Sequence, residues 1–263
     1  MLVRDLLTKL NDSFPFDSQS DWDNTGLQIG NPDSVIGGIY VSLDAEIFNI
    51  KKAIEMNSNV IITHHPLFYD GVKSLTKGNF FYDVLELVIK HDISIISVHT
   101  PFDFSNDGMK KFFLTEIAKS EVKTFVEDDD LGIIFDIDKR PLRDIKLILK
   151  SHYEELLGKE KTEYIRIYGE LGASIKRIAY VGGSGASFIK NAINSKVDLY
   201  ITSDIKYHEA QNAIRNELCL VDLTHSVSEI QFVSIISEII KDLGITKVYG
   251  DLDTFDGLML KNR

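Results

Sequence analysis

The sequence predicts an α/β protein built from two similar, interlinked domains, each with a mostly parallel sheet. Short apolar segments of strand length alternate with segments whose apolar residues recur at helical spacing. The same strand, helix, strand order occurs in both halves of the chain. The strand segments are apolar without alternation, which is typical of parallel strands that helices cover on both faces.

The first half has a β-α-β-α-β pattern. Helix 45–56 is predicted because Ile47, Ile50 and Ile54 fall on one helical face. The elements expected here are strands 39–43, 59–63 and 93–98 and helices 45–56 and 80–90.

The second half repeats this order. Phe48 and the residues up to Ile54 resemble the segment from Phe188 to Ile193. This repeat of the element order indicates two domains, 1–125 and 126–263, with a C-terminal helix that could pack back on the first domain. The alternative is that common βα units recur here by coincidence. The expected elements are strands 178–181, 197–202 and 218–223, helix 188–193 and a final helix that ends at Gly244.

The stretch between the two copies follows another pattern. It predicts a strand at 132–135, a helix at 143–157 and a strand at 164–168. The acidic run 127–130 lacks the spaced ligands and turn glycine of a calcium loop, so it is predicted to be a solvated turn.

Composition excludes several functional classes. With 40 acidic and 29 basic residues the formal charge is −11, which opposes long-range attraction to nucleic acid or anionic lipid. No apolar run reaches the roughly 18 residues that a membrane span needs, and the first residues do not resemble a signal peptide, so a cytoplasmic location is expected. The single cysteine, Cys219, forms no internal disulfide and is expected to be buried.

Candidate metal ligands lie where predicted strands end. His64 and His65 follow strand 59–63, and Asp103 lies shortly after strand 93–98. Imidazole nitrogens and carboxylate oxygens are both ligands of divalent metals. Because neighbouring side chains on a strand point to opposite faces, His64 and His65 can serve one site only beyond the strand end.

A second candidate pair, His225 and Glu229, has two interpretations. At positions i and i+4 of one helix, the two side chains would share a face and could bind metal together. Alternatively, Ser226 to Glu229 is a capping box in which Glu229 only bonds the backbone.

Other polar and glycine residues have weaker signals. Gly182-Gly183-Ser184-Gly185 is predicted to be a tight turn rather than a phosphate cradle. His208 follows a strand end and could contact substrate, whereas His91 and His152 are predicted to be ordinary hydrogen-bonded histidines.

Together these motifs resemble one known family. The resemblance rests on Trp22-Asp23-Asn24-Thr25-Gly26-Leu27-Gln28, Thr63-His64-His65-Pro66-Leu67, His99-Thr100 with Asp103, Gly182-Gly183-Ser184-Gly185, Thr202-Ser203-Asp204 with Tyr207-His208, and Asp222 with His225 and Glu229. The chain is similar to the NIF-three-like family, also known as GTP cyclohydrolase I type 2 homologues, in the short form without an inserted domain. It departs from the family at Ser203, where glycine is usual, and at Pro101-Phe102, where Asn-Leu is commoner.

The resemblance implies a dinuclear metal site in the cleft between the two domains. Its implied cofactors are two divalent ions, Zn, Mn or Fe, and its implied ligands are His64, His65, Asp103, His225 and Glu229, with Glu229 as the bridging carboxylate. His99 and His208 are then expected to transfer protons or contact substrate. Members of the family assemble as toroidal hexamers, so self-association is expected.

The function expected from this resemblance is a metal-dependent hydrolase, with opening of the GTP imidazole ring at C8 and release of formate as the candidate reaction. Two alternatives remain: a non-catalytic metal-binding scaffold or regulatory protein, and a dinuclear nucleotide phosphoesterase.

Overall fold

A computed structural model describes residues 1–126, 131–158 and 162–253. The chain forms two compact units, one made of Met1–Phe102 with Phe232–Arg263 and the other of Asp103–Gln231. This division differs from the boundary expected after residue 125, because the last described strand pairs with the first sheet and residues 123–126 pair with the second. The predicted acidic turn at 127–130 lies outside the described residues.

The sheet of the first unit is mostly parallel, as predicted. In the described residues its order is β1-β4-β3-β2-β11, and only the pairing of β1 with β4 is antiparallel. The strands are β1 (Gly26–Ile29), β2 (Ile39–Ser42), β3 (Val60–Thr63), β4 (Ser94–Ser97) and β11 (Val248–Gly250).

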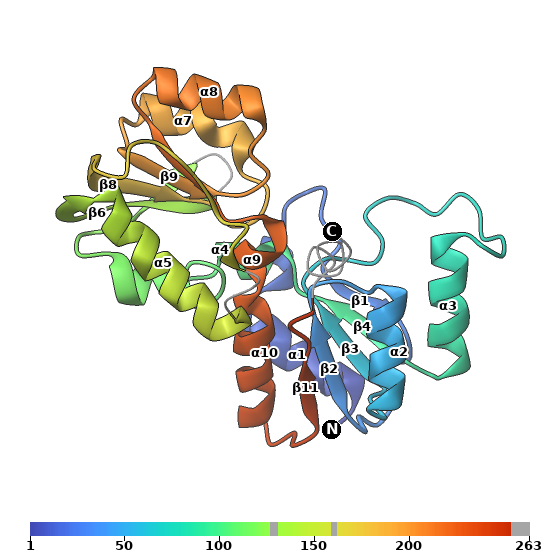
Figure 1. The fold of residues 1–263 in the computed structure, drawn as a ribbon. Helices are drawn as coiled ribbons and strands as arrows, with labels where there is room; N and C mark the ends of the chain where they lie inside the picture. Colours follow the sequence, from blue (N-terminus) through green and yellow to red (C-terminus); the bar gives the residue numbers. More distant parts are fainter. Residues whose placement is uncertain (127–130, 159–161, 254–263) are drawn as a thin grey trace. The chain divides into compact units, whose positions relative to one another are not determined.

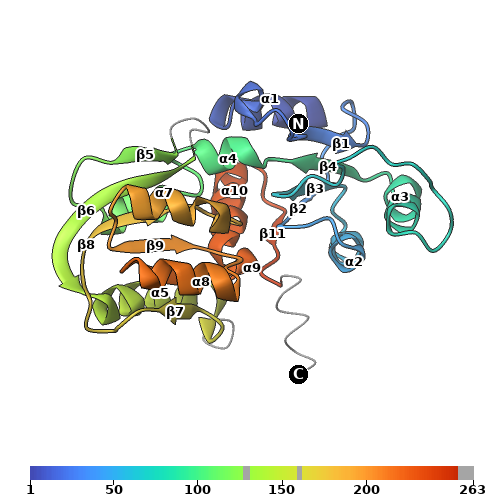
Figure 2. The ribbon, with the colours of Figure 1, turned by 90° about the horizontal axis from the view of Figure 1, so that it is seen from above.

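Helices cover both faces of this sheet. Figures 1 and 2 agree in placing α2 and α3 on one face and α1 and α10 on the other. Beneath α2 and α3, Ile50 and Val88 pack with Ile61 of β3 in a buried cluster. The helices are α1 (Val3–Ser13), η1 (Phe16–Ser18), α2 (Ile47–Glu55), α3 (Phe80–Lys90), α10 (Gln231–Asp242) and the short α4 (Thr100–Phe104), whose residues are divided between the two units after Phe102.

The sheet of the second unit is mixed, which corrects the prediction of a mostly parallel sheet. Its order in the described residues is β5-β6-β8-β9-β10-β7, in which only β8 with β9 and β9 with β10 are parallel. The β5–β6 and β6–β8 pairs and the edge strand β7 are antiparallel. The strands are β5 (Lys123–Val126), β6 (Leu131–Pro141), β7 (Arg166–Tyr168), β8 (Ser174–Tyr180), β9 (Leu199–Thr202) and β10 (Cys219–Asp222).

The predicted repeat of the element order corresponds to two β-α-β-α-β segments with parallel strands, one in each unit. In the first unit β2, α2, β3, α3 and β4 follow one another, and in the second β8, α7, β9, α8 and β10 do so. The helical elements of the second unit are η2 (Phe113–Ile117), α5 (Leu142–Leu157), η4 (Ala186–Phe188), α7 (Ile189–Asn194), α8 (Tyr207–Arg215) and α9 (His225–Glu229).

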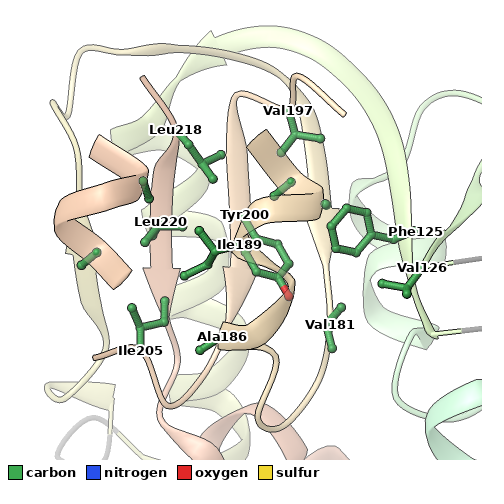
Figure 3. Packing of buried hydrophobic residues seen from close by; sticks show 14 residues of the cluster. Phe125, Val126, Val181, Ala186, Ile189, Val197, Tyr200, Ile205, Leu218 and Leu220 are labelled. Atoms are coloured by element: carbon green, nitrogen blue, oxygen red, sulfur yellow. The ribbon is translucent and has the colours of Figure 1, made fainter. Parts of the chain in front are cut away.

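An apolar cluster between the second sheet and helices α7 and α8 supports the glycine-rich turn. Tyr200 lies at its centre, near Ile189, with Leu220 on one side and Phe125 on the other (Figure 3). The Tyr200 hydroxyl donates a hydrogen bond to the Gly185 carbonyl at 2.8 Å. The core therefore holds this turn in place through a buried polar contact.

A buried carboxylate anchors the end of the last strand in the first unit. Asp251 accepts hydrogen bonds from the Tyr40 hydroxyl and from Asn49 Nδ2, the latter at 3.0 Å. Lys52 Nζ lies 3.1 Å from the same carboxylate.

Neither β11 nor α1 was among the elements that the sequence predicted. Within the described residues, no helix has the length and apolar character needed to cross a membrane.

His152 on α5 gives a pH prediction for the second unit. Its ring stacks on Phe112 with centroids 3.6 Å apart, and burial lowers its pKa from 6.5 to about 4, against the opposing charge of Glu116. The unfolded chain therefore binds this proton at higher pH than the folded protein. The neutral ring of His152 makes its full contribution to the free energy of unfolding above pH 6.5, and this contribution is lost as the pH falls toward 4.

We expect His152→Phe to flatten the decrease in unfolding free energy between these pH values, measured by urea denaturation of both proteins. His91→Phe, at an exposed site, is the matched control. Parallel pH curves for wild type and His152→Phe would contradict the assignment.

Candidate metal centre

Three histidines of the first unit form a donor group beyond the ends of β3 and β4. Strand β3 ends at Thr63, and the Thr63 hydroxyl donates to the His65 carbonyl at 2.8 Å in the turn that follows. The turn brings the rings of His64 and His65 to a centroid distance of 5.0 Å, as expected for residues past the strand end. His64, His65 and His99 each offer one ring nitrogen, and these three atoms all lie within 4.8 Å of one another.

Each of these rings is oriented through its Nδ1 atom. His65 Nδ1 lies 2.8 Å from Asp44 Oδ1, and His99 Nδ1 lies 2.8 Å from Asp23 Oδ1. His64 Nδ1 lies 3.1 Å from the Val98 carbonyl oxygen. These acceptors favour the tautomer with hydrogen on Nδ1, which leaves the lone pair of Nε2 for an ion.

The surroundings of the histidine group are apolar on one side and charged on the other. His64 is fully buried, and its ring centroid lies 5.0 Å from that of Phe232 and 5.9 Å from that of Phe102. The Asp23 side chain is also buried; although burial opposes its ionisation, hydrogen bonds from His99 and Thr100 lower its pKa well below the usual range. A low-dielectric wall beside fixed carboxylates strengthens the attraction for a cation.

The second unit contributes a histidine and a glutamate. His225 and Glu229 lie on the same face of α9, with His225 Nε2 3.3 Å from Glu229 Oε1. His225 Nδ1 lies 2.7 Å from Asp204 Oδ2. Burial disfavours the charged imidazole, but the charge of Glu229 and the bond to Asp204 outweigh it and raise the pKa of His225 to about 11.

The capping-box interpretation of this segment is wrong. Helix α9 begins at His225, and its N-cap is Thr224, so Ser226 lies inside the helix. Thr224 has a φ of 64° and a ψ of 154°, a conformation that is rare for residues other than glycine. Its amide donates to Asp222 Oδ1 at 3.1 Å. The start of α9 is therefore a strained turn held by a buried carboxylate.

The glycine-rich turn packs against Glu229. Gly183 has a φ of +60°, and a Cβ atom there would lie 2.3 Å from Glu229 Oε1. Its amide donates to Ser228 Oγ at 3.0 Å. The steric prediction for this turn is therefore confirmed, since glycine is needed both for the backbone conformation and for the approach of Glu229.

The remaining predicted site residues have different surroundings. Asp103 lies on α4. Burial raises the pKa of the Tyr180 hydroxyl well above its usual value, and the negative charges of Asp103 and Glu229 raise it further. His208 is exposed at the start of α8, with its ring 5.2 Å from that of Tyr207. Its role stays a prediction.

Sequence reasoning assigned no role to the residues that orient the histidines, although Asp23 and Asp204 lie in motifs on which the family resemblance rests. Asp44 and Asp204 each follow a parallel strand, so the strand-end rule could have found them. Asp23 lies in a loop far from His99 in sequence, and no local pattern pointed to the pair.

Comparison with known proteins supports one family. The family model described as Duf34/NIF3 (NGG1p interacting factor 3) matches residues 1–249. The chain belongs to the Duf34/NIF3 family.

Two bacterial relatives carry the names that the resemblance anticipated. A "GTP cyclohydrolase 1 type 2 homolog" of Campylobacter jejuni is 30% identical over 249 residues, covering 92% of this chain and 93% of the relative. A Helicobacter pylori protein named "GTP cyclohydrolase 1 type 2" is 31% identical, covering 91% of each chain. The crystal structure of a Bacillus cereus protein related to NIF3 shares the fold, with a TM-score of 0.83 at 17% identity, covering 97% of this chain and 98% of that one.

The donors of this Duf34/NIF3 chain fit divalent metal. The first unit offers three clustered imidazoles, two of them oriented by carboxylates, and the second offers an imidazole beside a buried carboxylate. Borderline ions such as Zn²⁺, Mn²⁺ and Fe²⁺ accept this mixture of nitrogen and oxygen ligands.

Gly183→Ala should disturb Glu229. The added methyl group would clash with its carboxylate oxygen, and the left-handed backbone adds a strain of about 1 kcal/mol. We expect a lower thermal midpoint and reduced metal content, measured by calorimetry and elemental analysis. Gly172→Ala is the control, because nothing lies within 4 Å of a Cβ atom at that position. Equal metal content in the two variants would count against the close packing of Gly183 on Glu229.

Asp44→Ala should weaken metal binding without removing a ligand. His65 loses the acceptor at Nδ1 that fixes its orientation, and loss of such a partner lowers metal affinity by roughly 10- to 100-fold. Competition with a chromophoric chelator measures the affinity. Asp12→Ala, which changes an exposed carboxylate on α1, should leave it unaltered. An unchanged affinity in Asp44→Ala would show that His65 needs no such support.

Proposed function

We propose that this protein is a metal-dependent hydrolase that acts on a nucleotide, with opening of the purine imidazole ring of GTP as the candidate reaction. The observation that carries the proposal is the pairing of histidine donors with orienting acceptors in each unit. Such partners are a regular feature of metal-ligating histidines. The name of the Helicobacter pylori relative, "GTP cyclohydrolase 1 type 2", supports the choice of reaction.

The proposed ligands are those that the sequence indicated. His64 and His65 from the first unit and Asp103, His225 and Glu229 from the second would hold two divalent ions. The support is the donor chemistry and the grouping of these residues within each unit. Divalent ions held there would supply Lewis acidity and make water a nucleophile at neutral pH.

His64 and the residues around the ligands would have separate tasks. His64, packed against Phe102 and Phe232, would keep water from the apolar side of the site. His99 would hold or transfer a proton at Nε2, because Asp23 fixes the opposite nitrogen and stabilises the positive charge of the imidazolium. Asp204 would hold His225 through Nδ1.

Assembly is proposed on the same resemblance. We expect a homohexameric ring, and native mass spectrometry at micromolar concentration tests it. A monomer under those conditions would contradict this part of the proposal.

Removal of one donor from either unit should abolish the reaction. We expect the metal-reconstituted wild type to release formate from GTP, and His65→Ala and Glu229→Ala to lose metal and at least roughly 100-fold in rate, since an activated water depends on the bound ion. His91→Ala and Glu238→Ala, at exposed positions, are the matched controls for the lost imidazole and carboxylate.

Three outcomes separate the candidate functions. Metal-dependent formate release supports ring opening, whereas release of phosphate from GTP or from a phosphoester panel identifies a phosphoesterase. Full metal binding with neither product identifies a non-catalytic scaffold. Wild-type metal content in both variants would contradict the proposed ligands.

A further inference from the structure

Two exposed aromatic side chains of the first unit lie beside the histidine group. Trp22 is 61% exposed and Tyr69 is 48% exposed, although both are large rings that usually contribute to cores. Their rings are nearly parallel, at 20°, with centroids 6.5 Å apart. Each is roughly perpendicular to the His99 imidazole, at centroid distances of 5.5 and 5.8 Å. Trp22 and Tyr69 are called the aromatic platform below.

Hydrogen bonds between two distant segments hold the aromatic platform. Asn24 Nδ2 donates to the Phe68 carbonyl at 2.8 Å and to Gln28 Oε1 at 3.1 Å. The Phe68 amide in turn donates to Gln28 Oε1 at 3.3 Å. These bonds join the loop that carries Trp22 to the segment that carries Tyr69.

A buried carboxylate fixes the other end of the loop. Asp23, next to Trp22, accepts hydrogen bonds from the Thr100 amide at 3.0 Å and the Thr100 hydroxyl at 2.5 Å, besides its bond to His99. The two exposed rings are therefore positioned in advance, which reduces the entropy lost when a ligand binds them.

The charges around the aromatic platform disfavour a phosphate group. Residues 18–28 and 64–72, which include both rings, contain no lysine or arginine, and the first basic residue after them is the exposed Lys73. The neighbours Asp21 and Asp70 are exposed acidic residues. A flat uncharged ring meets no electrostatic penalty from these two carboxylates and gains stacking energy, whereas the same carboxylates repel a phosphate group placed on the rings.

We propose that Trp22 and Tyr69 bind the planar heteroaromatic ring of the substrate, a purine base, by stacking beside His99. This inference rests on the proposed function for the nucleotide class of the substrate. It assigns the base to the aromatic platform and leaves the phosphates to be held elsewhere. Trp22 and Tyr69 are then the residues that select ring-containing ligands over sugar phosphates and simple phosphoesters.

The chain offers a direct reporter for this contact. Trp22 is its single tryptophan, so fluorescence excited at the red edge of tryptophan absorption comes from the platform alone. We expect guanosine and GTP to quench this emission in the metal-reconstituted protein. Inorganic tripolyphosphate and ribose 5-phosphate should leave it unchanged.

Variants measure the contribution of each ring. Calorimetric titration with guanosine should show Kd raised by roughly 5- to 150-fold in Trp22→Leu and in Tyr69→Leu, the range expected for loss of one stacking partner. Trp22→Phe and Tyr69→Phe, which keep a ring, should lose much less. Tyr164→Leu, at another exposed tyrosine, is the control. Because both platform rings are exposed, these variants should fold, and a thermal melt checks this.

The outcomes distinguish this inference from the proposed function. Guanosine quenching with Kd losses in both leucine variants supports the platform even if no formate is released, a result that would refute only the hydrolase. Formate release with unchanged KM and guanosine Kd in both variants would overturn the platform and leave the hydrolase standing. Quenching by tripolyphosphate but not by guanosine would also overturn the proposal that the aromatic platform binds the base. The same holds if Trp22→Leu changes the mass of the oligomer but leaves the affinity for guanosine unchanged.

Discussion

The contacts that four histidine rings make through Nδ1 determine in which direction each ring can offer Nε2 to a metal ion. An imidazole can offer Nε2 to an ion in a defined direction only when its other nitrogen is held. In the first unit, the acceptors for His64, His65 and His99 are the Val98 carbonyl, Asp44 and Asp23. Because parallel strands end at a common edge, the residues that follow β2, β3 and β4 can meet there.

The second unit meets the same requirement with different elements. Asp204 follows β9 in a left-handed conformation, with φ of 59°, and accepts from His225 on α9. Thr224 adopts a strained backbone immediately before that helix, and Gly183 leaves room for Glu229. Non-glycine residues with positive φ persist where surrounding contacts hold them, and such residues concentrate at functional sites. The cost in local stability here coincides with the placement of a histidine and a carboxylate.

The sequence allowed the local parts of this arrangement to be predicted, but not the pairings between distant residues. The apolar pattern placed His64 and His65 after a strand. For His225 and Glu229, four residues apart, spacing left metal binding and a capping box both open, and the family resemblance favoured the ligand set. The pairing of Asp23 with His99 joins residues 76 positions apart, and no local pattern encodes it. The mixed second sheet was missed because β6 is longer than its apolar segment suggested: Leu131–Pro141 includes charged residues that pair with β8 at the exposed part of the sheet.

The proposed metal centre makes the imidazoles of the first unit and the His225–Glu229 pair of the second ligands of divalent metal. X-ray absorption spectroscopy of the protein reconstituted with zinc or manganese tests this proposal. We predict multiple scattering from several imidazoles together with backscattering from a second metal, and loss of both signals in a protein that carries His65→Ala and Glu229→Ala. A spectrum with oxygen ligands only, or one that the double substitution leaves unchanged, would contradict the claim.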